Sequence, residues 1–543
     1  MTQIPAILPY QRAWLRADVL AGLATGAVVI PQAMAYATVA GMPVQVGLYT
    51  CMVPLIVYAF LGGSRTASVT TTSTIATLSA SALLSAGAVI GSPDAEARLV
   101  TLTFLVGIFL LVARFLHLGS IIENVNQATL LGIKVGVGLT VAASQLPKLL
   151  GVPPDPKEDG FFGLLRSAFA ELSHANAVTT GLSVAAIAAL LAMARWMPKI
   201  PGPLIVVTVG ILLAVYAGLP ERGVALIPEV AQGIPVPTLP SLQHIPDLVP
   251  GALAIALMAF LETLAVASSV RRPDEPAVDP NREISATGFA AILGSLTHSL
   301  PPAGGFSQTG VNLKAGAKSQ VSGLVTAALA VLVAVALAPI LSELPQAILG
   351  AMVFVAVLGL IDVGALSQLY RFERHEFALA AVVAAIALTV GLLPAVAAGV
   401  VLTLYSVLRE LNRAHVAQLV SQHELWVEGP ENVLAEPADP LVVRTRLGLY
   451  TANLRPNVDG IRSMVSECSP APAVLVWDLS AQPVLTSTML NGLRDAETEL
   501  AGIRVIYAAL PEALHETAQR WPWWQQVESE GRYFPTVSAA VSA

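Results

Sequence analysis

Residues 68–80 read SVTTTSTIATLSA, and residues 304–316 read GGFSQTGVNLKAG. In both stretches, hydroxyl and glycine residues interrupt a long apolar sequence. Consecutive Ser and Thr residues disfavour a helix interior but serve well as N-caps, and glycines allow a turn just before a helix begins. Each stretch therefore predicts an extended segment that leads into a short helix. One stretch lies in each half of the apolar region, as expected of an internal repeat.

The composition around these stretches is that of a polytopic membrane protein. Of the 543 residues, 55% are hydrophobic and 12% are charged, and the mean hydropathy is +0.70. Soluble proteins carry roughly 25% charged residues. A membrane span needs roughly 20 mostly apolar residues. About fourteen segments fit this template, near residues 19–40, 46–62, 72–90, 98–116, 125–147, 175–194, 203–219, 249–270, 284–300, 308–320, 322–340, 344–361, 376–391 and 393–411.

An even number of spans places both termini on one side of the membrane. With the termini in the cytosol, cytoplasmic positions hold 15 Lys and Arg residues, and the opposite side holds 5. This asymmetry predicts a multi-pass inner-membrane protein with both termini cytoplasmic. Residues 1–17 then form a cytoplasmic N-terminus without the pattern of a removable signal peptide, and residues 18–413 form the transmembrane domain.

Residues 414–543 have a different pattern, in which predicted strands alternate with amphipathic helices. They hold 8 basic and 15 acidic residues, which accounts for the whole net charge of −7. We therefore expect a small, soluble α/β domain in the cytosol. Its acidity argues against a nucleic-acid partner, which requires a basic surface.

The residues give no support to an enzyme. The two cysteines, Cys51 and Cys468, lie in an apolar segment and in the tail, so they indicate neither a disulfide framework nor a metal site. No nucleophile motif, nucleotide loop or metal-ligand spacing is present, and no cofactor is expected.

Interrupted segments at corresponding positions of two inverted repeats mark the binding site of many transporters. There, helix N-termini point N–H groups and positive dipole ends at an anionic ligand. The run from Thr71 to Thr74 (Thr71, Thr72, Ser73, Thr74) and the pair Ser307 and Gln308 are the candidate contacts. From the residues alone, a helix cap, small-residue packing or a plain break between spans explains each stretch equally well.

The stretch VVIPQAMAYATVAGMP begins at Val28 and carries a proline break at Pro31. Gln32 and Tyr36 follow it four residues apart, and so share one face of the resumed helix. The break is either a structural kink or a means of bringing a polar amide to a ligand.

The stretch ALMAFLETLAVAS, residues 256–268, places Glu262 at the centre of an apolar span. A charge there costs roughly 2.5–3.5 kcal/mol on insertion scales, so it needs a partner or a function. Lys134 is the one basic residue that this topology assigns to neither side and leaves inside another span, and it could form an ion pair with Glu262. Alternatively Glu262 takes up a proton, because burial favours the neutral carboxyl group.

Four stretches resemble the SulP sulfate-permease family of anion transporters. They are DVLAGLATGAVVIPQAMAYATVAGMPVQVGLYT, PNREISATGFAAILGSL, GVNLKAGAKSQVSGLV and LPQAILGAMVFVAVLGLI, and the tail resembles the family's cytoplasmic STAS domain. The resemblance implies seven plus seven inverted segments, divided into a mobile core and a gate domain. It also implies a homodimer and an elevator-like movement.

The same resemblance implies roles for single residues. Gln32 and Tyr36 stand at first-segment contacts to the anion. Glu262 stands at the acidic position of the eighth segment, which some bacterial relatives use for proton or sodium coupling. The third-segment half-helix begins at Thr71, Thr72, Ser73 and Thr74, and the tenth-segment half-helix begins at Phe306, Ser307 and Gln308.

The chain departs from the family pattern at three places. Gln308 stands where many members have arginine, which removes a fixed positive charge and weakens the case for dianionic sulfate. Thr70 and Thr71 replace a Gly-Pro pair. In the tail, Leu485 replaces the acidic residue of the common phosphorylation motif, in which Ser487 is the candidate regulatory residue.

Together these features predict a secondary active transporter of a small anion of the sulfate, bicarbonate, chloride or small carboxylate class. Proton symport through Glu262 and an elevator-like mechanism are the expected mode. The partners would be the anion, the proton, the lipid bilayer, a second copy of the chain and a cytosolic protein that binds the tail. An uncoupled channel, an exchanger and a transport-dead signalling scaffold remain as alternatives.

Overall fold

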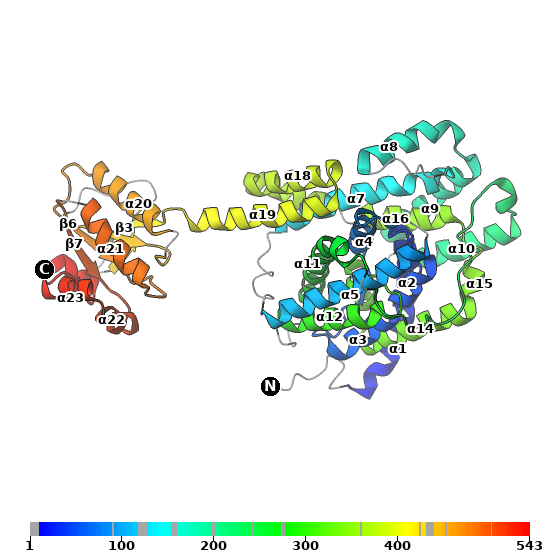
Figure 1. The fold of residues 1–543 in the computed structure, drawn as a ribbon, viewed down its shortest axis with the longest axis horizontal. Helices are drawn as coiled ribbons and strands as arrows, with labels where there is room; N and C mark the ends of the chain where they lie inside the picture. Colours follow the sequence, from blue (N-terminus) through cyan, green and yellow to red (C-terminus); the bar gives the residue numbers. More distant parts are fainter. Residues whose placement is uncertain are drawn as a thin grey trace. The chain divides into compact units, whose positions relative to one another are not determined.

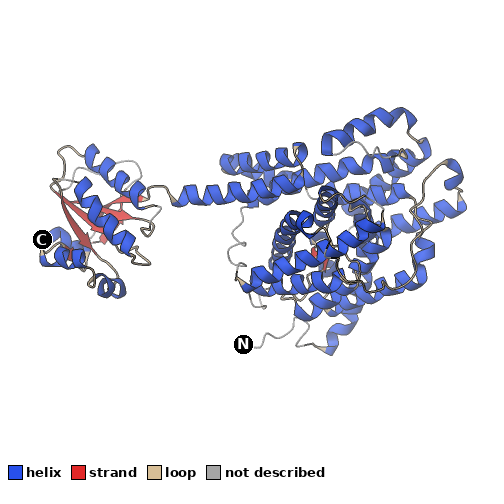
Figure 2. Ribbon diagram, viewed as in Figure 1, coloured by secondary structure: helices blue, strands red, loops and turns tan. Residues whose placement is uncertain are grey.

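The structure is a computed structural model that describes residues 10–89, 92–117, 127–153, 160–197, 202–241, 243–272, 275, 277–358, 361–422, 425–429, 439–450, 453–500 and 502–543. The chain divides into two compact units, Met1–Thr403 and Leu404–Ala543. The first is almost entirely helical, and the second contains a β-sheet covered by helices (Figures 1 and 2).

One group of helices in the first unit comes from both halves of the sequence. We call it the core bundle. Its members are α1 (Leu15–Val39), α2 (Val44–Thr50), α3 (Val53–Leu61), α4 (Ser73–Ser85), α5 (Pro93–Phe115), α11 (Ile245–Ser269), α12 (Pro280–Ser295), α13 (Phe306–Lys314) and α14 (Val321–Leu332). Helix α5 packs against α11 and α12, α1 packs against α2, α13 and α14, and α4 packs against α11.

The remaining long helices form a second group, the gate bundle. Its members are α7 (Gln127–Leu150), α8 (Gly160–Ala170), α9 (Ala177–Trp196), α10 (Gly202–Tyr216), α16 (Gln346–Leu358), α17 (Val363–Phe372), α18 (Arg374–Thr389) and α19 (Leu392–Leu411). Helix α7 packs against α16 and α18, and Thr129 of α7 hydrogen-bonds Thr403 of α19 at 2.7 Å. The two bundles touch where α1 meets α10 and α16, and where α4 meets α7.

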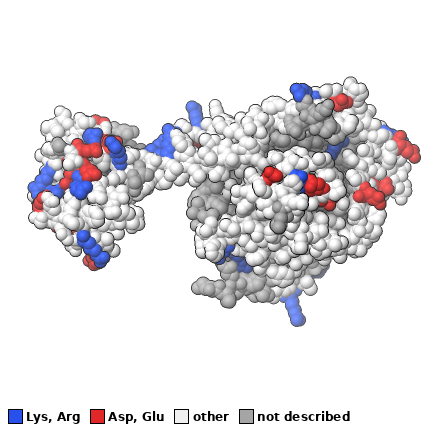
Figure 3. Space-filling view, viewed as in Figure 1, with Lys and Arg blue, Asp and Glu red and all other residues white. Residues whose placement is uncertain are grey.

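Each predicted span coincides with a helical segment, so the predicted polytopic fold is confirmed. Within the described residues, nine helices or helix runs are long and apolar enough to cross a membrane. The surface of this unit is accordingly mostly uncharged on the face seen in Figure 3, with its charged side chains confined to a few small patches. The other predicted spans are shorter helices: α4, α10, α12, α13 and α18. Helix α14 also continues through a π-helical turn, Val333–Leu337, into α15 (Ala338–Leu341).

Two of the short helices are each preceded by a two-residue strand. Strand β1 (Val69–Thr70) leads towards α4, and β2 (Ala303–Gly304) leads towards α13. The strands pair antiparallel, with Val69 opposite Gly304 and Thr70 opposite Ala303. This pair is the small sheet inside the helical unit in Figure 2. It joins the two halves of the sequence.

The second unit is a six-stranded sheet in the order β4-β3-β5-β6-β7-β8. Its strands are β3 (Val416–Gln422), β4 (Leu425–Glu428), β5 (Leu441–Thr445), β6 (Val474–Asp478), β7 (Arg504–Ala508) and β8 (Tyr533–Phe534). The pairs from β5 to β8 are parallel, and those among β4, β3 and β5 are antiparallel.

Alternating residues of the second unit's strands face two separate apolar layers. Trp477 and Tyr507 belong to the larger layer, and Val476 and Ile506 belong to the smaller one. The helices of this unit are α20 (Leu454–Glu467), α21 (Ser487–Glu499), α22 (Glu512–Ala518), α23 (Pro522–Ser529) and α24 (Val537–Ser542). Because α24 supplies the smaller layer with Val537 and Ala540, both faces of the sheet are covered.

Candidate anion-binding site

The starts of α4 and α13 lie on either side of the β1–β2 pair. Thr72 caps α4 by accepting a hydrogen bond from the Ile75 amide, and Gly305 precedes α13. The first N–H groups of a helix have no acceptor within it, and they carry the positive end of the helix dipole. Two such ends beside one strand pair form a cradle suited to an anion.

Close packing against α11 holds the cradle in place. A Cβ atom at Gly304 would lie 2.9 Å from the Thr263 Cα atom, so only glycine fits where β2 crosses α11. The Gly304 amide donates to the Thr263 hydroxyl oxygen at 2.9 Å. The cradle therefore lies directly beside Glu262, the neighbour of Thr263.

Gln308 ties the two half-helix segments together. Its amide nitrogen donates to the Thr71 carbonyl oxygen at 2.9 Å, and its amide oxygen accepts from the Thr70 hydroxyl at 2.7 Å. The side chain is 3% exposed. Both ends of its amide group are therefore hydrogen-bonded to the segment before α4. Phe306 and Ser307, at the same helix start, are exposed.

Two polar side chains at the cradle have a buried atom without a hydrogen-bond partner in the described part of the chain. The atoms are the Thr71 hydroxyl and the amide oxygen of Gln32. Buried polar atoms are nearly always paired, so unpaired ones mark a place where a ligand or water can bind. Tyr36 is also buried, and it interacts electrostatically with Glu262 and lies beside Ser73. Residues of α1, α4 and α11 thus come together here.

Glu262 is buried and accepts a hydrogen bond from the Thr72 hydroxyl at 2.7 Å. Lys134 and Thr74 interact with it electrostatically. No ion pair of Glu262 within 4.0 Å is found among the described residues. The carboxyl group is thus linked directly to the N-cap of α4.

Lys134 brings a positive charge to the start of α13 from the gate bundle. Its ammonium nitrogen lies 5.3 Å from the centre of the Phe306 ring, within the range of a cation–π contact. This chain has Gln308 where the family pattern has a positively charged arginine. Lys134 of α7 therefore supplies a positive charge close to that position. Span prediction identified Lys134 but could not show that α7 faces α13.

Sequence reasoning missed the polar network behind the cradle. Asn312, one helical turn after Gln308, bonds the Thr66 carbonyl oxygen at 2.9 Å and the Thr25 hydroxyl at 3.2 Å. Gln320 donates to the carbonyl oxygens of Ser64 and Ala67, both at 2.8 Å. The four-residue spacing of Gln308 and Asn312 was a usable signal, because it puts both amides on one face of α13.

It also missed two buried carboxyl groups. Glu283 accepts hydrogen bonds from the Tyr58 hydroxyl and the Gly63 amide, each at 2.8 Å. Asp18 accepts from the amides of Lys318 and Ser319 and from the Ser319 hydroxyl. Both lie one residue outside a predicted span, where composition does not mark them as buried. Each joins segments distant in sequence, and neither contacts the cradle residues directly.

The remaining predicted position belongs to the second unit. Ser487 is exposed at the first position of α21 in the second unit, next to the N-cap Thr486. In the described residues, no cluster of three His, Cys, Asp or Glu side chains could hold a metal ion.

Comparison with known proteins identifies the family. The model of the sulfate permease family matches residues 15–383, which include every cradle residue described above. The chain belongs to the sulfate permease family. It is accordingly a multi-pass membrane transporter of anions and not an enzyme.

Individual relatives of this chain agree with that assignment. A probable sulfate transporter of Mycobacterium tuberculosis is 34% identical over 98% of this chain and 96% of its own length. A sulfate transporter of Arabidopsis thaliana, numbered 1.1, is 28% identical over 67% of this chain and 58% of its own length.

Solved structures share the fold. The murine solute carrier 26 family member A9 anion transporter, in its inward-facing state, has a TM-score of 0.87 and 21% identity, covering 99% of this chain and 92% of its own. The transmembrane domain of a cyanobacterium bicarbonate transporter has a TM-score of 0.63 and 21% identity, covering 72% and 98%. The α/β unit of this chain agrees with the predicted STAS domain.

Proposed function

We propose that this sulfate permease is a proton-coupled symporter whose preferred anion is sulfate, bound in the cradle between α4 and α13. The supporting observation is the hydrogen bond from Thr72, the N-cap of α4, to the carboxyl group of Glu262. A change in the protonation of Glu262 acts directly on the helix end that would hold the anion.

The charges around the cradle relate the proton to the anion. Each helix N-terminus contributes about half a positive charge, so two contribute about one. Lys134 adds one, and an ionised Glu262 subtracts one. The cradle thus carries about one positive charge with Glu262 ionised and about two with it protonated. A dianion such as sulfate matches the protonated state, whereas a monoanion matches the ionised one.

The name of the relative that covers nearly the whole chain also favours sulfate. The contacts we assign to the anion are the helix N–H groups, the side chains of Gln32 and Tyr36, and the hydroxyls of Thr71, Ser73, Thr74 and Ser307. Thr72, Phe306 and Gln308 position these groups through the bonds and the ring contact described above.

Transport would follow an elevator-like movement of the core bundle past the gate bundle. The cradle belongs entirely to the core, and Lys134 belongs to the gate. Movement would carry a bound anion and a neutral Glu262 away from Lys134 together.

The proposal includes residues 18–413 as a transport domain in the inner membrane, residues 414–543 as a cytoplasmic domain beside a cytoplasmic N-terminus, and a homodimer.

Uptake by proteoliposomes tests this function. Labelled sulfate, bicarbonate and chloride are offered with and without an inward proton gradient. We expect sulfate to accumulate only when the outside is more acidic. Accumulation of a monoanion without any effect of the gradient would instead indicate an uncoupled transporter, and no accumulation would refute active transport.

Substitution of Glu262 tests the coupling. The Glu262→Gln variant keeps the cradle in its neutral-acid state, so sulfate should still exchange across the membrane but should no longer accumulate against a gradient. The pH dependence of uptake should be lost. Glu283→Gln is the matched control, because Glu283 is equally buried but contacts Tyr58 and Gly63 instead of the cradle. Unchanged acid-driven accumulation in Glu262→Gln would refute the coupling role.

A further inference from the structure

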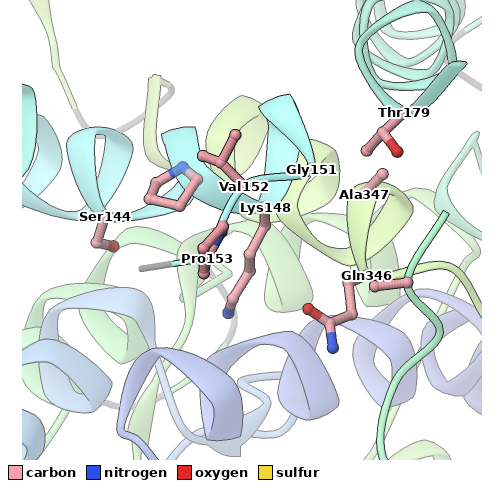
Figure 4. Close-up of a pocket in the computed structure, with 10 residues that line it drawn as sticks. Ser144, Lys148, Gly151, Val152, Pro153, Thr179, Gln346 and Ala347 are labelled. Carbon is pink, nitrogen blue, oxygen red and sulfur yellow. The ribbon is translucent and has the colours of Figure 1, made fainter. Parts of the chain in front are cut away.

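A second polar pocket lies at the end of α7, and none of the residues that line it belongs to the cradle. It has a volume of about 260 Å³, and its lining comes from α7, α9, α16 and the segments between them. The polar side chains of the lining are Ser144, Lys148, Thr179 and Gln346. Figure 4 shows Lys148 and Gln346 extending to the same side.

Lys148 is the only charged residue of this lining, and it forms no ion pair with any described acidic residue. Its ammonium group donates to the Thr38 hydroxyl at 3.1 Å. An ammonium group has three N–H donors, so two remain for another acceptor. A partly buried cation without a counter-charge favours the binding of an anion.

The surroundings of Lys148 are organised by other bonds. Thr38 donates its own proton to the Ala35 carbonyl oxygen at 2.7 Å, so its oxygen is oriented to accept from Lys148. The Gln346 amide nitrogen is held by the Leu226 carbonyl oxygen at 2.9 Å. The Thr179 hydroxyl, in a side chain that is 2% exposed, has no partner among the described residues.

We propose that the Lys148 pocket is a second anion site, separate from the cradle, that binds a small inorganic oxyanion such as sulfate. Lys148 supplies the charge, and Thr179 and Gln346 supply polar contacts, whereas the Ser144 hydroxyl already donates to the Val141 carbonyl oxygen at 2.7 Å. The pocket lining belongs to the gate bundle and its connections, whereas Thr38, which accepts the hydrogen bond from Lys148, belongs to the core bundle. The position of Lys148 therefore depends on this arrangement of the two bundles. The inference concerns binding alone and does not rest on proton coupling.

Cysteine labelling in the full-length protein tests the site without requiring transport. Ala225 lines the pocket and is exposed, so Ala225→Cys is introduced into a chain that also carries Cys51→Ala and Cys468→Ser. We expect an anionic thiosulfonate reagent to modify the introduced thiol several times faster than a cationic reagent of similar size. Sulfate, compared with gluconate at equal ionic strength, should slow both reactions several-fold.

Variants of Lys148 identify the group responsible. Lys148→Met should remove both the preference for the anionic reagent and the protection by sulfate, and Lys148→Arg should retain both. Equal labelling rates with and without sulfate in the chain that keeps Lys148 would overturn the proposal, whether or not the variants fold. Protection that survives Lys148→Met would overturn it too, because the sulfate would then be bound elsewhere.

The same labelling separates this site from the proposed transport function. In the Glu262→Gln background we expect the protection of the introduced thiol by sulfate to be unchanged. A chain that accumulates sulfate without protection of this thiol lacks the second site but remains a transporter. A chain in which sulfate protects the thiol but no anion accumulates has the second site but not the proposed function.

Discussion

At the scale of single residues, Glu262 and Lys134 lie close to one another without forming an ion pair. Their charges come from different bundles, α11 in the core and α7 in the gate. A buried pair in direct contact would neutralise both groups and would cost desolvation energy that the pair regains only with good geometry. Kept apart, Lys134 remains able to attract an anion and Glu262 remains able to take up a proton.

Removal of the Lys134 charge should weaken sulfate binding more than chloride binding. At about 8 Å and an effective dielectric constant of about 20, one charge contributes about 2 kcal/mol per unit of anion charge. We expect Lys134→Met to raise the KM for sulfate by at least roughly tenfold, since 1.4 kcal/mol corresponds to a factor of ten. Lys134→Arg should preserve most of the affinity. Equal effects on the two anions in uptake assays would contradict this electrostatic role.

Gln308 should matter for stability as well as for transport. In Gln308→Leu, the Thr70 hydroxyl and the Thr71 carbonyl oxygen lose their partner, and each buried unpaired group costs roughly 1–3 kcal/mol. We expect a lower thermal unfolding midpoint in detergent and reduced uptake. Ser307→Ala, at the exposed neighbouring position, is the control for stability. A Gln308→Leu protein that unfolds at the wild-type temperature would show that these bonds do not hold the segments together.

Sequence reasoning could single out residues whose chemistry is unusual in a membrane. Glu262, Lys134 and the hydroxyl run stood out because polar groups are costly there. Lys148 did not, because a lysine at the end of a span is ordinary and its importance depends on Thr38, more than 100 positions away in the chain. Asp18 and Glu283 were missed for a related reason, since composition places them at span ends and only packing shows that they are buried.

At the scale of elements, the interrupted segments explain why some spans are short. Helix α13 has 9 residues and α4 has 13, so neither crosses a membrane as a helix alone. Each has a strand before it, and the strands satisfy their exposed N–H and C=O groups by pairing with one another. Irregular backbone is tolerated at membrane depth only where protein or a cavity surrounds it. Hydropathy found these segments but could not show that they pair.

The contact between α1 and α2 should be intolerant of added volume. A Cβ atom at Gly47 would lie 2.2 Å from the Ala33 carbonyl oxygen, next to Gln32 of the cradle. We expect Gly47→Ala to lower the thermal unfolding midpoint by several degrees and to abolish uptake, because backbone atoms must move. Gly181→Ala is the matched control, since nothing lies within 4 Å of its Cβ position on α9. Gly181→Ala should be neutral or slightly stabilising.

At the scale of the whole molecule, the two units differ in how they bury apolar surface. The membrane unit leaves large apolar side chains exposed, such as Tyr216 at 83%. The tail unit covers both faces of its sheet with helices. The difference in charge along the sequence predicted this division, but the order of the strands required the structure, because β3 and β4 add to the sheet antiparallel to the other strands.

The tail should therefore fold without the membrane unit. We expect residues 412–543, expressed alone, to be soluble and to unfold in one cooperative transition followed by tryptophan fluorescence and circular dichroism. Trp477→Ala should destabilise this fragment by roughly 3–5 kcal/mol because its side chain is fully buried. Val484→Ala, at a 59% exposed position, should change its stability by less than about 0.5 kcal/mol. An insoluble or non-cooperative fragment would contradict this expectation.

The β1–β2 pair also bears on how such a chain can have originated. Each strand comes from one half of the sequence and finds its only described strand partner in the other half. An ancestral gene encoding a single half would have had to produce two copies inserted in opposite orientations, with their strands paired across the dimer axis. Duplication and fusion of that gene would then release each copy to diverge. The second half could then acquire Glu262 on α11, while the first half kept the Thr72 hydroxyl that donates to it.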